Sequence, residues 1–575
     1  MRLNSRASLL CPELHHKLNA PSRFNLSLRI EDDPLPKALK EAGIKYEAKV
    51  LAELESLGLR IFHVQKKMGD FVEESETAFA LLQPEVDVII GASFGDHIEG
   101  ALRKLGHSDF IGDDIRSSRP DLLVRISPKG SKPAWAPVDI KSHKAFEDNK
   151  SNLIAISKLP AMDPARSEKI SATLVKKDGM QLAHYMRHLQ NLGLAPVTPW
   201  GGILGSDSTF IAWADLNALT YGVGQARSGV LTEYDHQFAA AKEVVEASLL
   251  REKDPELPKV TIPRRISSEF GCPSCEMRKV CRTEMEGFDN GAGHVTLLSD
   301  VTAGKAKLYF PGIESIRELI AAQGLPPQGI KAQIRADVWV SKEPRLMNPS
   351  EPLKIPEFDI EIDIDLENSQ EALREADLET IGRDSVYLYG YGIHDRSKNA
   401  DWRTAQFGYF DDYSDTDEAE FIVLSQMWQF IKDQIASAEA QGKSIGIFHY
   451  SSHERTWWRN FVDRHSAKPG SPFIEEIEGI MNKYFVDLLP IAQRVALPLT
   501  GYSIKALAPH AGFNWQVSDA GGGNSIVYYQ TATSSTSTTE EKETAIKWLR
   551  DYNRDDVRAT FAVREYLRSI QNSLR

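Results

Sequence analysis

One segment of the chain alternates strictly between apolar and acidic residues. From Phe358 to Glu367 an apolar side chain stands at every second position and an acidic one stands between. Because successive side chains of a strand point to opposite faces, this period predicts a strand with one apolar face and one carboxylate face. The carboxylates on that face are Asp359, Glu361, Asp363, Asp365 and Glu367. A solvated strand face explains such a pattern, but carboxylates on one side repel one another, and a divalent metal ion would relieve that repulsion.

Length and composition indicate a globular protein of several domains. At roughly 100–200 residues per domain, a chain of 575 residues should hold about three or four compact units. With 42% hydrophobic and 26% charged residues, the composition excludes collagen-like, disordered and disulfide-scaffold proteins. No apolar run approaches the ~18 residues of a membrane helix, and Met1 to Ala20 lacks the apolar stretch of a secretory signal. We therefore expect a cytoplasmic protein without a membrane partner.

The formal charge of −13 bears on the partners of the protein. It argues against a protein that coats nucleic acid through a bulk positive field, without excluding a local basic groove. Part of the acidic excess lies in the alternating segment and in other carboxylates that are candidates for metal binding. We therefore expect phosphate to be bound through metal ions and a few local cations. The phosphate loop G-x-x-x-x-G-K-[ST] is absent, which excludes a helicase or ATPase of that type.

The order of predicted elements divides the chain into three parts. Residues 1–288 read as a helix, several short strands, a helix and further strands, which indicates an α/β or α+β core. In residues 289–350, Pro311-Gly312-Ile313 and the helix pattern after it suggest a helical hairpin, a module that can hold nucleic-acid backbone, although a plain linker fits at least as well. Residues 351–575 read as a second α/β unit. We therefore predict an α/β fold class with two large domains and a small helical linker.

The cysteines are few and clustered. Three of the four lie within ten residues, Cys272, Cys275 and Cys281, and Cys11 is the only other one. Four thiolates suit either zinc or an iron–sulfur cluster, whereas a disulfide is disfavoured in a reducing cytosol. Separate buried cysteines would leave the CxxC-x5-C spacing unexplained. A shared metal site would join distant parts of one domain, and its binding energy would then contribute to folding.

Between Cys11 and Cys272 lies a first set of acidic residues. Asp121 follows Arg119-Pro120 and leads into one predicted strand, and Asp139 and Lys141 end the next. Side chains at i and i+2 share a strand face, so Asp139 and Lys141 should point together. The two carboxylates could hold Mg²⁺ or Mn²⁺, and Lys141 could position a water or offset charge that develops at phosphorus. Most D-x-K triplets, however, are only surface charge.

Further residues extend this set. Gln181 and Tyr185 stand one helical turn apart, so both could reach the same groove, and Glu47 on an earlier helix is a candidate ligand. Together these residues resemble the RecB-like branch of the PD-(D/E)XK nucleases. In that branch a helical acid or His is followed by an Asp ending one strand, a D/E-x-K on the next and a QxxxY helix. The resemblance covers about residues 5 to 285 and implies a restriction-endonuclease-like fold, with Glu47 standing where many relatives have His.

The cysteine pattern resembles the iron–sulfur subset of the same branch, which includes nucleases of CRISPR adaptation. In that subset one cysteine precedes the nuclease core and three follow it around a [4Fe–4S] cluster. The resemblance therefore implies such a cluster on Cys11, Cys272, Cys275 and Cys281, with zinc as the alternative.

The C-terminal helix pattern carries a second resemblance. Tyr552 and Asp556 stand at i and i+4, the YxxxD arrangement of the DEDD exonucleases in the RNase H-like superfamily. In that family a first-strand D-x-E, a middle acid and the YxxxD Asp bind two metal ions, and the Tyr orients the nucleophile. The resemblance implies Asp365 and Glu367 as the D-x-E, because this pair meets a loop, with Asp359 and Glu361 as the alternative register. It implies Glu454 as the middle acid, although the family has Asp there.

Residues 351–575 resemble the YprB-like RNase H-like domain, which recurs behind RecB-like nucleases. The two resemblances imply a metal-dependent DNA nuclease with two Mg²⁺ or Mn²⁺ centres, which favours single-stranded or end-containing DNA in repair, recombination or defence. One alternative is a nucleic-acid-binding module with one or both centres inactive, working with a helicase or nuclease partner. The other is an RNA-directed exonuclease, because such domains act on either polymer.

Overall fold

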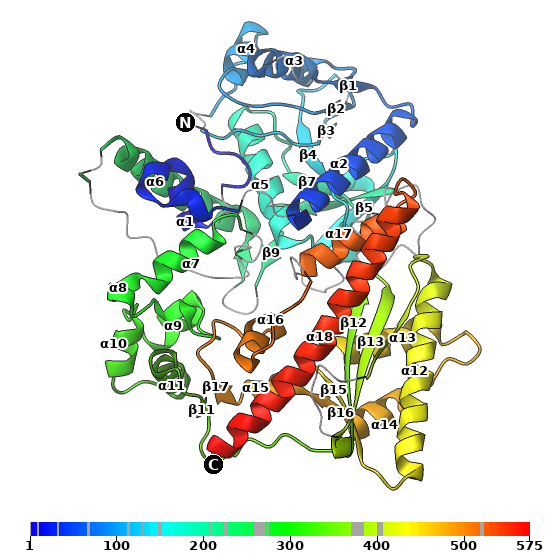
Figure 1. The fold of residues 1–575 in the computed structure, drawn as a ribbon. Coiled ribbons are helices and arrows are strands. Elements are labelled where there is room, and N and C mark those ends of the chain that lie inside the picture. The colour runs from blue at the N-terminus through cyan, green and yellow to red at the C-terminus, as the bar shows by residue number, and fades with distance from the viewer. Residues whose placement is uncertain are drawn as a thin grey trace. The chain divides into compact units, whose positions relative to one another are not determined.

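The fold was examined in a computed structural model of the chain. It describes residues 2–7, 11–30, 34–65, 69–111, 115–128, 130–147, 152–206, 209–222, 227–254, 256–257, 272, 275–369, 384–398, 406–517 and 522–574. Two compact units are present (Figure 1). The first unit comprises Met1–Leu28 and Lys40–Pro263, and the second unit comprises Arg29–Leu39 and Arg264–Arg575. The predicted boundaries at residues 288 and 350 stay predictions. Among the described residues, no helix is both long and apolar enough to cross a membrane.

The first unit is built on an eight-stranded mixed sheet in the order β1-β2-β3-β4-β7-β8-β5-β6. β1 pairs parallel with β2, and β4 pairs parallel with β7, whereas the other neighbours are antiparallel. The strands are β1 (Ile61–His63), β2 (Val88–Ile90), β3 (Leu122–Arg125), β4 (Trp135–Ile140), β5 (Leu153–Lys158), β6 (Glu168–Ser171), β7 (Trp200–Leu204) and β8 (Phe210–Asp215), with a separate pair β9 (Thr220–Tyr221) and β10 (Ser228–Gly229).

Helices cover this sheet because their apolar faces match its buried strands. The helices of this unit are α1 (Pro12–Asn19), which packs on α6, α2 (Pro34–Glu55), which enters the first unit at Lys40, α3 (Asp70–Leu82), α4 (Ile98–Lys104), α5 (Lys176–Asn191) and α6 (Val230–Lys253). α5 contributes Leu182 and Met186 to a core shared with Ile203 of β7. α2 contributes Val50 and Leu54 to a core shared with Val138 of β4. All six residues of β4 are buried, so the strand that carries Asp139 is fixed on both sides.

The second unit is built on a five-stranded sheet in the order β14-β13-β12-β15-β16. β12 pairs antiparallel with β13 and parallel with β15, β13 is antiparallel to β14, and β15 is parallel to β16. The strands are β12 (Ile360–Asn368), β13 (Val386–Asp395), β14 (Gln406–Asp411), β15 (Ile445–His449) and β16 (Phe485–Asp487), with a separate pair β11 (Arg345–Leu346) and β17 (Val495–Ala496).

The predicted two-faced strand is β12, which begins two residues after Phe358. Its apolar face, with Ile362, Ile364 and Leu366, packs in one core with residues of α12 and α13. Its carboxylate face is not solvated as a surface strand would be, because α18 covers it through ion pairs (Figure 1). Gly390 of β13 permits this close approach, since a Cβ there would collide with Asn553 of α18.

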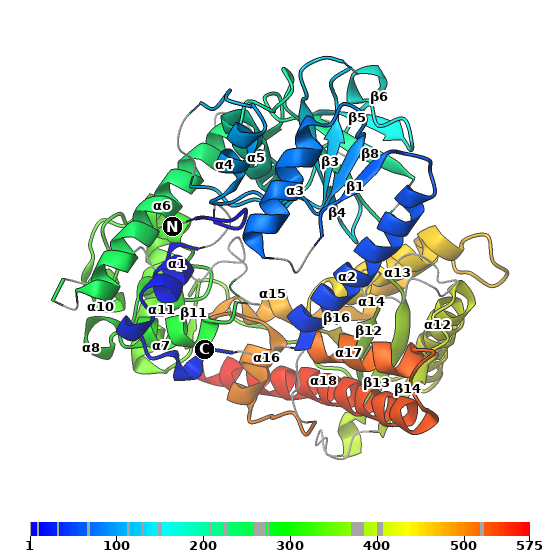
Figure 2. The ribbon, with the colours of Figure 1, turned by 90° about the horizontal axis from the view of Figure 1, so that it is seen from above.

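The remaining elements of the second unit are helices. They are α7 (Arg278–Glu286), α8 (Phe288–Gly291), α9 (Ala303–Tyr309), α10 (Ile316–Ala321), α11 (Pro327–Ser341), α12 (Asp417–Ala440), α13 (His453–His465), α14 (Ile474–Tyr484), α15 (Leu488–Ala492), α16 (Ile504–Leu507), α17 (Gly522–Thr533) and α18 (Thr539–Ser573). Pro311-Gly312-Ile313 lies in the connection between α9 and α10, and the helical-hairpin linker stays a prediction. α17 lies beside α18 in both views (Figures 1 and 2).

Candidate metal centres

Three carboxylates come together where β12 meets α18. Asp365 and Glu367 of β12 and Asp556 of α18 each place an oxygen within 4.8 Å of the others. Asp556 is buried, and the other two side chains are partly buried. Carboxylate oxygens are the donors that Mg²⁺ and Mn²⁺ favour, so the three residues fit a divalent ion. The preferred register, in which Asp365 and Glu367 form the first-strand pair, names two of these three residues and stays a prediction.

Desolvation and mutual repulsion perturb these acids. Desolvation, followed by the charge of Asp556, raises the pKa of Glu367 from an ordinary 4.5 to about 8. Desolvation also raises the pKa of Asp365 well above its ordinary value, and the charges of Asp556, Glu367 and Glu454 add to the effect. Strongly perturbed acids in one cluster are typical of functional sites and of metal centres in particular.

Other side chains hold Asp365 and Asp556 in place, and sequence reasoning assigned them no role. Lys505 Nζ and Trp515 Nε1 each donate to Asp556 Oδ1 at 2.6 Å. Asn553 Nδ2 donates to Asp365 Oδ2 at 2.8 Å. Desolvation raises the pKa of Asp556, and bonds from Lys505, Trp515 and the Tyr552 hydroxyl oppose the rise. Asn553 lies three residues before Asp556 on the same helix, and this spacing was the one local feature of the sequence that could have identified Asn553.

The other acids of β12 have arginine or serine partners. Arg564 Nη2 lies 2.7 Å from Asp363 Oδ2, and Arg568 Nη2 lies 2.6 Å from Glu361 Oε1. Arg564 also pairs with Glu361. Asp359 accepts hydrogen bonds from the backbone and hydroxyl of Ser444. The alternative register, with Asp359 and Glu361 as ligands, is therefore disfavoured by the ion pairs that occupy Glu361.

Glu454 lies near the three carboxylates but outside their group. It is buried at the start of α13, and its Oε2 lies 3.3 Å from His449 Nδ1. His449 also bonds the carbonyl of Ser451, a residue with a left-handed φ of 84°. Among the described residues, the acids within 4.8 Å of one another here are Asp365, Glu367 and Asp556 only. The middle-acid role of Glu454 stays a prediction.

A second group in the same unit joins α12 and α13. Asp417, Glu420 and His465 place ligand atoms within 4.8 Å of one another. Cations already accompany these acids, since Arg464 lies 2.8 Å from Glu420 and Lys468 lies 2.9 Å from Asp417. The charges are thereby balanced within the protein, and we interpret the group as an ion-pair network between helices.

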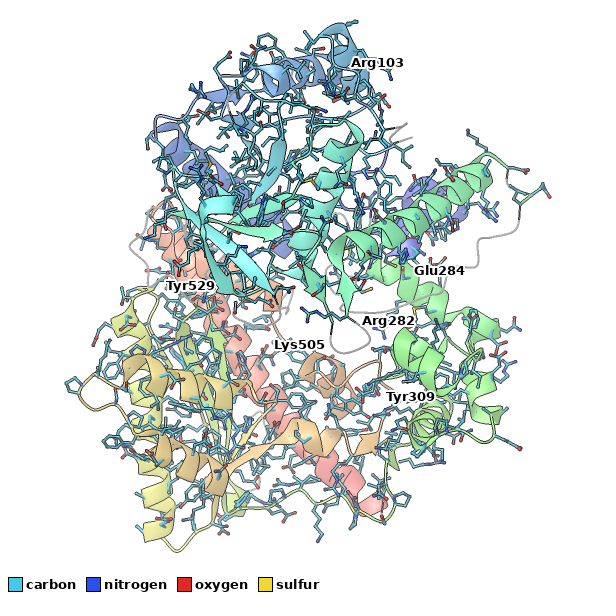
Figure 3. All side chains as sticks on the ribbon, turned by 180° about the vertical axis from the view of Figure 1, so that it is seen from behind. Arg103, Arg282, Glu284, Tyr309, Lys505 and Tyr529 are labelled. Atoms are coloured by element: carbon cyan, nitrogen blue, oxygen red, sulfur yellow. The ribbon has the colours of Figure 1, made fainter. Side chains whose placement is uncertain are left out.

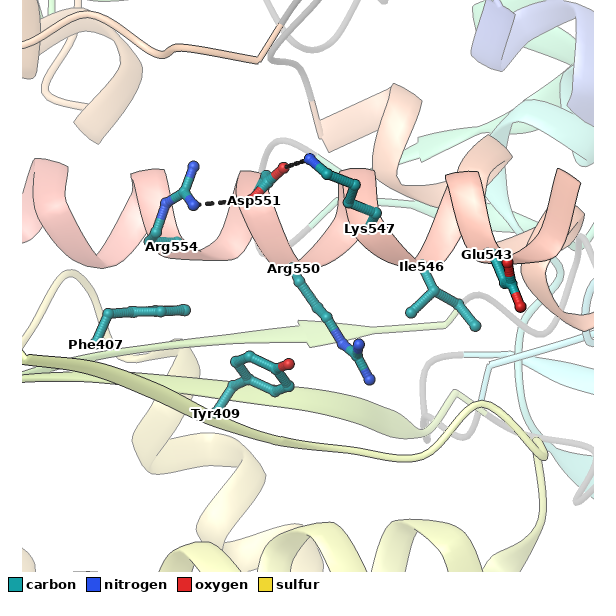
Figure 4. Close-up of a pocket in the computed structure, with 8 residues that line it drawn as sticks. All are labelled: Phe407, Tyr409, Glu543, Ile546, Lys547, Arg550, Asp551 and Arg554. Carbon is teal, nitrogen blue, oxygen red and sulfur yellow. Dashed lines mark hydrogen bonds and ion pairs between the residues drawn. The ribbon is translucent and has the colours of Figure 1, made fainter. Parts of the chain in front are cut away.

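A surface pocket of about 470 Å³ lies on α18 beside the edge strand β14. Figure 4 shows Lys547 and Arg554 directed toward Asp551 along the helix, whereas Arg550 extends from the helix to the side of Tyr409. Its cations have acidic partners, since Lys547 and Arg554 both pair with Asp551, and Arg550 pairs with Asp411. The pocket therefore offers little uncompensated positive charge to a phosphate.

In the first unit, the structure joins five of the predicted residues in one network. Asp121 precedes β3, and its Oδ2 accepts the backbone N–H of Ile140 at 2.8 Å. Asp139 Oδ2 lies 3.2 Å from Lys141 Nζ, so the two side chains share a face as the spacing predicts. Lys141 Nζ donates to Gln181 Oε1 at 3.1 Å, and Gln181 Nε2 donates to the Tyr185 hydroxyl at 2.7 Å.

Burial perturbs these groups as well. Desolvation and then the charge of Asp139 raise the pKa of Asp121 to about 8, and desolvation raises the pKa of Asp139. Burial lowers the pKa of Lys141, but the nearby carboxylates outweigh it and the pKa is raised overall. Lys141 therefore remains a cation.

Two further acids border this network. Glu47 of α2 is close enough for its charge to raise the pKa of Asp121. In the described part of the chain, however, Glu47, Asp121 and Asp139 do not form a group of ligand atoms within 4.8 Å. Asp178, which sequence reasoning missed, is buried and lies 3.4 Å from His143. Asp178 stands three residues before Gln181 on α5, and this spacing could have identified it from the sequence.

The predicted four-cysteine cluster requires a correction. No three of the cysteine sulfurs within the described residues lie within 4.8 Å of one another. Cys275 Sγ accepts the N–H of Met277 at 3.4 Å, whereas Cys281 lies on α7. The spacing in sequence therefore does not bring the sulfurs into one ligand set.

Comparison with known proteins identifies an RNase H-like domain in the C-terminal part of the chain. A family model described as RNase H superfamily matches residues 376–568. This range contains Glu454, Tyr552 and Asp556 and begins after β12. No curated protein and no solved structure matches the chain. The protein is thus a mixed α/β protein with two sheets, and its C-terminal part is an RNase H-like domain, whereas no comparison supports a RecB-like first unit.

Proposed function

We propose that this protein is a metal-dependent DNA nuclease, and that the RNase H-like unit acts as an exonuclease on single-stranded or end-containing DNA. The observation that carries the proposal is the group of Asp365, Glu367 and Asp556, three perturbed carboxylates with a common centre. These residues would hold Mg²⁺ or Mn²⁺. A bound divalent ion would supply an activated water and stabilise the charge of the leaving oxygen. The DNA preference and a role in repair, recombination or defence rest on the family resemblance.

The protein groups around the centre have separate tasks. Asn553 fixes the orientation of Asp365, and Lys505 with Trp515 fixes that of Asp556. Tyr552 stacks on Trp548 with ring centroids 5.0 Å apart, which restrains its hydroxyl beside Asp556. That hydroxyl is suited to orient an attacking water, because it already bonds a metal-binding residue. Such pre-arranged groups reduce the reorganisation that the reaction requires.

The proposal includes a second centre in the first unit, of the PD-(D/E)XK type. Its support is the chain of contacts from Asp139 through Lys141 and Gln181 to Tyr185, in the order that the RecB-like resemblance implies. Asp121 and Asp139 would hold the divalent ion. Lys141, which remains a cation, would offset negative charge at phosphorus.

Two alternatives keep specific support. The position of Glu454 outside the carboxylate group favours a nucleic-acid-binding protein whose RNase H-like centre is inactive and which works beside a helicase or another nuclease. The RNase H superfamily match is compatible with an RNA-directed exonuclease. An iron–sulfur cluster is left out of the proposal, because the cysteine sulfurs do not gather.

The test is a time course with end-labelled single- and double-stranded DNA and matched RNA in Mn²⁺. Lys141→Ala should remove cleavage by the first centre, Asp556→Asn should remove cleavage by the second, and the double variant should be inactive. The matched controls are Lys144→Ala, an exposed lysine three residues from Lys141, and Asp551→Asn on α18. Unchanged digestion by the double variant would refute the assignment. Binding without turnover by the wild type would favour the first alternative, and preferential RNA digestion would favour the second.

A further inference from the structure

The carboxylate centre of the second unit contains a cation of its own. Lys505, on α16, places Nζ 2.6 Å from Asp556 Oδ1. The ammonium also lies 4.1 Å from the ring centroid of Trp515 and 4.3 Å from that of Tyr552. Figure 3 labels Lys505 beside α18. An ammonium between two aromatic faces and a carboxylate is held in place by charge and by cation–π attraction together.

The charges of the centre balance with one divalent ion. Asp365, Glu367 and Asp556 carry three negative charges when ionised, and Lys505 carries one positive charge. One Mg²⁺ or Mn²⁺ would therefore make the set neutral. A second divalent ion would leave an excess of two positive charges in a poorly solvated site, which is costly unless further anions compensate.

One further acid, Glu454, interacts electrostatically with Asp365 but lies outside the ligand group. The family resemblance implies Glu454 as the middle acid. Its Oε2 lies 3.3 Å from His449 and outside the group of three ligand oxygens. Lys505, in contrast, directly contacts the centre.

We infer that this centre binds one divalent ion and that Lys505 serves as its second cation, in place of a second metal ion. The inference rests on the metal centre of the proposed function. Lys505 acts through Asp556 and is a positioning residue: together with Trp515 it occupies Oδ1 and leaves the rest of the carboxylate for the ion. Its charge also weakens the attraction between the carboxylates and a divalent ion.

The experiment counts Mn²⁺ bound to the full-length protein by isothermal titration and by the electron paramagnetic resonance signal of free Mn²⁺. All variants carry Asp139→Asn, which removes a proposed ligand of the centre in the first unit. Adding Asp556→Asn identifies the ions that belong to the centre of the second unit. Lys505→Met removes the charge with little change in length, and Lys505→Arg keeps the charge. Glu454→Gln tests the second-metal role directly.

We expect one equivalent of Mn²⁺ that Asp556→Asn abolishes. Lys505→Met should tighten its dissociation constant on the order of tenfold, or admit a second equivalent, whereas Lys505→Arg and Glu454→Gln should leave affinity within about twofold of the parent. A lysine with a merely structural role would weaken metal binding when lost. Two equivalents in the parent centre, or unchanged or weaker binding by folded Lys505→Met, would overturn the inference. If Lys505→Met does not fold, the number of Mn²⁺ ions bound by the parent and the Mn²⁺ affinity of Glu454→Gln still test the inference.

Metal binding and cleavage separate the two claims. One equivalent with the expected Lys505 response but no digestion of any nucleic acid would refute the proposed nuclease function and leave this inference standing. Digestion by a centre that binds two ions would refute this inference and leave the proposed nuclease function standing.

Discussion

Glu367→Gln should stabilise the metal-free protein while it removes metal binding by the RNase H-like centre. Glu367 has a pKa raised from 4.5 to about 8 by desolvation and by Asp556, so folding favours its neutral form. For a group with a raised pKa, the stability is fully present below the unfolded pKa and is lost as the pH rises through the folded one. The window of this loss is therefore about pH 4.5 to 8. Because glutamine is neutral at every pH, the variant does not lose this unfolding free energy as the pH rises.

The magnitude follows from the two pKa values. At roughly 1.4 kcal/mol per pH unit, the interval from 4.5 to about 8 corresponds to about 5 kcal/mol of unfolding free energy. Because the three acids share protons, this is the largest effect that the substitution can have. For a unit of this size it amounts to a melting temperature higher by on the order of 10 °C.

The assay is calorimetry of the full chain in a chelator at pH 5 and pH 8.5, with hydrogen exchange of β12 and α18 peptides to assign the transition. The variant should melt with the wild type at pH 5 and well above it at pH 8.5. Mn²⁺ should raise the melting temperature of the wild type and not that of the variant. Glu357→Gln, an exposed glutamate that precedes β12, is the matched control. A variant that melts at or below the wild type at pH 8.5 would show that Glu367 is not held in a charge-repelling site.

Two other predictions follow from buried charges. Arg564→Met should destabilise the second unit by about 3–5 kcal/mol, because Asp363 and Glu361 would keep buried charges. Asp363→Leu in the same chain should restore most of the lost stability. Urea denaturation measures both effects, with exposed Lys547→Met as the control, and an Arg564→Met variant of unchanged stability would contradict the pairing. The Mn²⁺ affinity of the first unit should rise with pH up to about 8 and then stay constant, because Asp121 must lose a proton to bind the metal ion. Titration calorimetry of the Asp556→Asn variant in two buffers should detect the released proton. An Mn²⁺ affinity that does not depend on pH below about 8 would contradict the raised pKa of Asp121.

The two-faced character of β12 was predictable, because period two is a local property of one strand. The pattern alone does not give the partner of its carboxylate face, since α18 begins only at Thr539, and only the YxxxD resemblance places Asp556 with Asp365 and Glu367. A solvated face is the wrong interpretation for Glu361 and Asp363, since both are buried. Arg564 and Arg568 cover them.

The arginine end of this contact follows from geometry that joins both segments. Four residues of helix rise about 6.0 Å, and two residues of strand rise about 6.6 Å. Glu361 and Asp363, two residues apart on β12, therefore match Arg568 and Arg564, four residues apart on α18. The same spacing does not extend to Asp365, which bonds Asn553. The arginines neutralise one end of the strand, and Asp365 and Glu367 at the other end stay the predicted ligand pair.

Each candidate centre pairs its acids with a lysine, and the two lysines differ in how they could be found. Lys141 stands two residues from Asp139 on one strand, so its contact of 3.2 Å follows from strand geometry alone. Lys505 lies 51 residues from Asp556, on a different helix, and nothing local connects them. Buried acids that await a metal ion are costly without a nearby cation, so a lysine beside them is expected on physical grounds. Physical chemistry therefore predicts a lysine near the acids, and only the fold identifies it as Lys505.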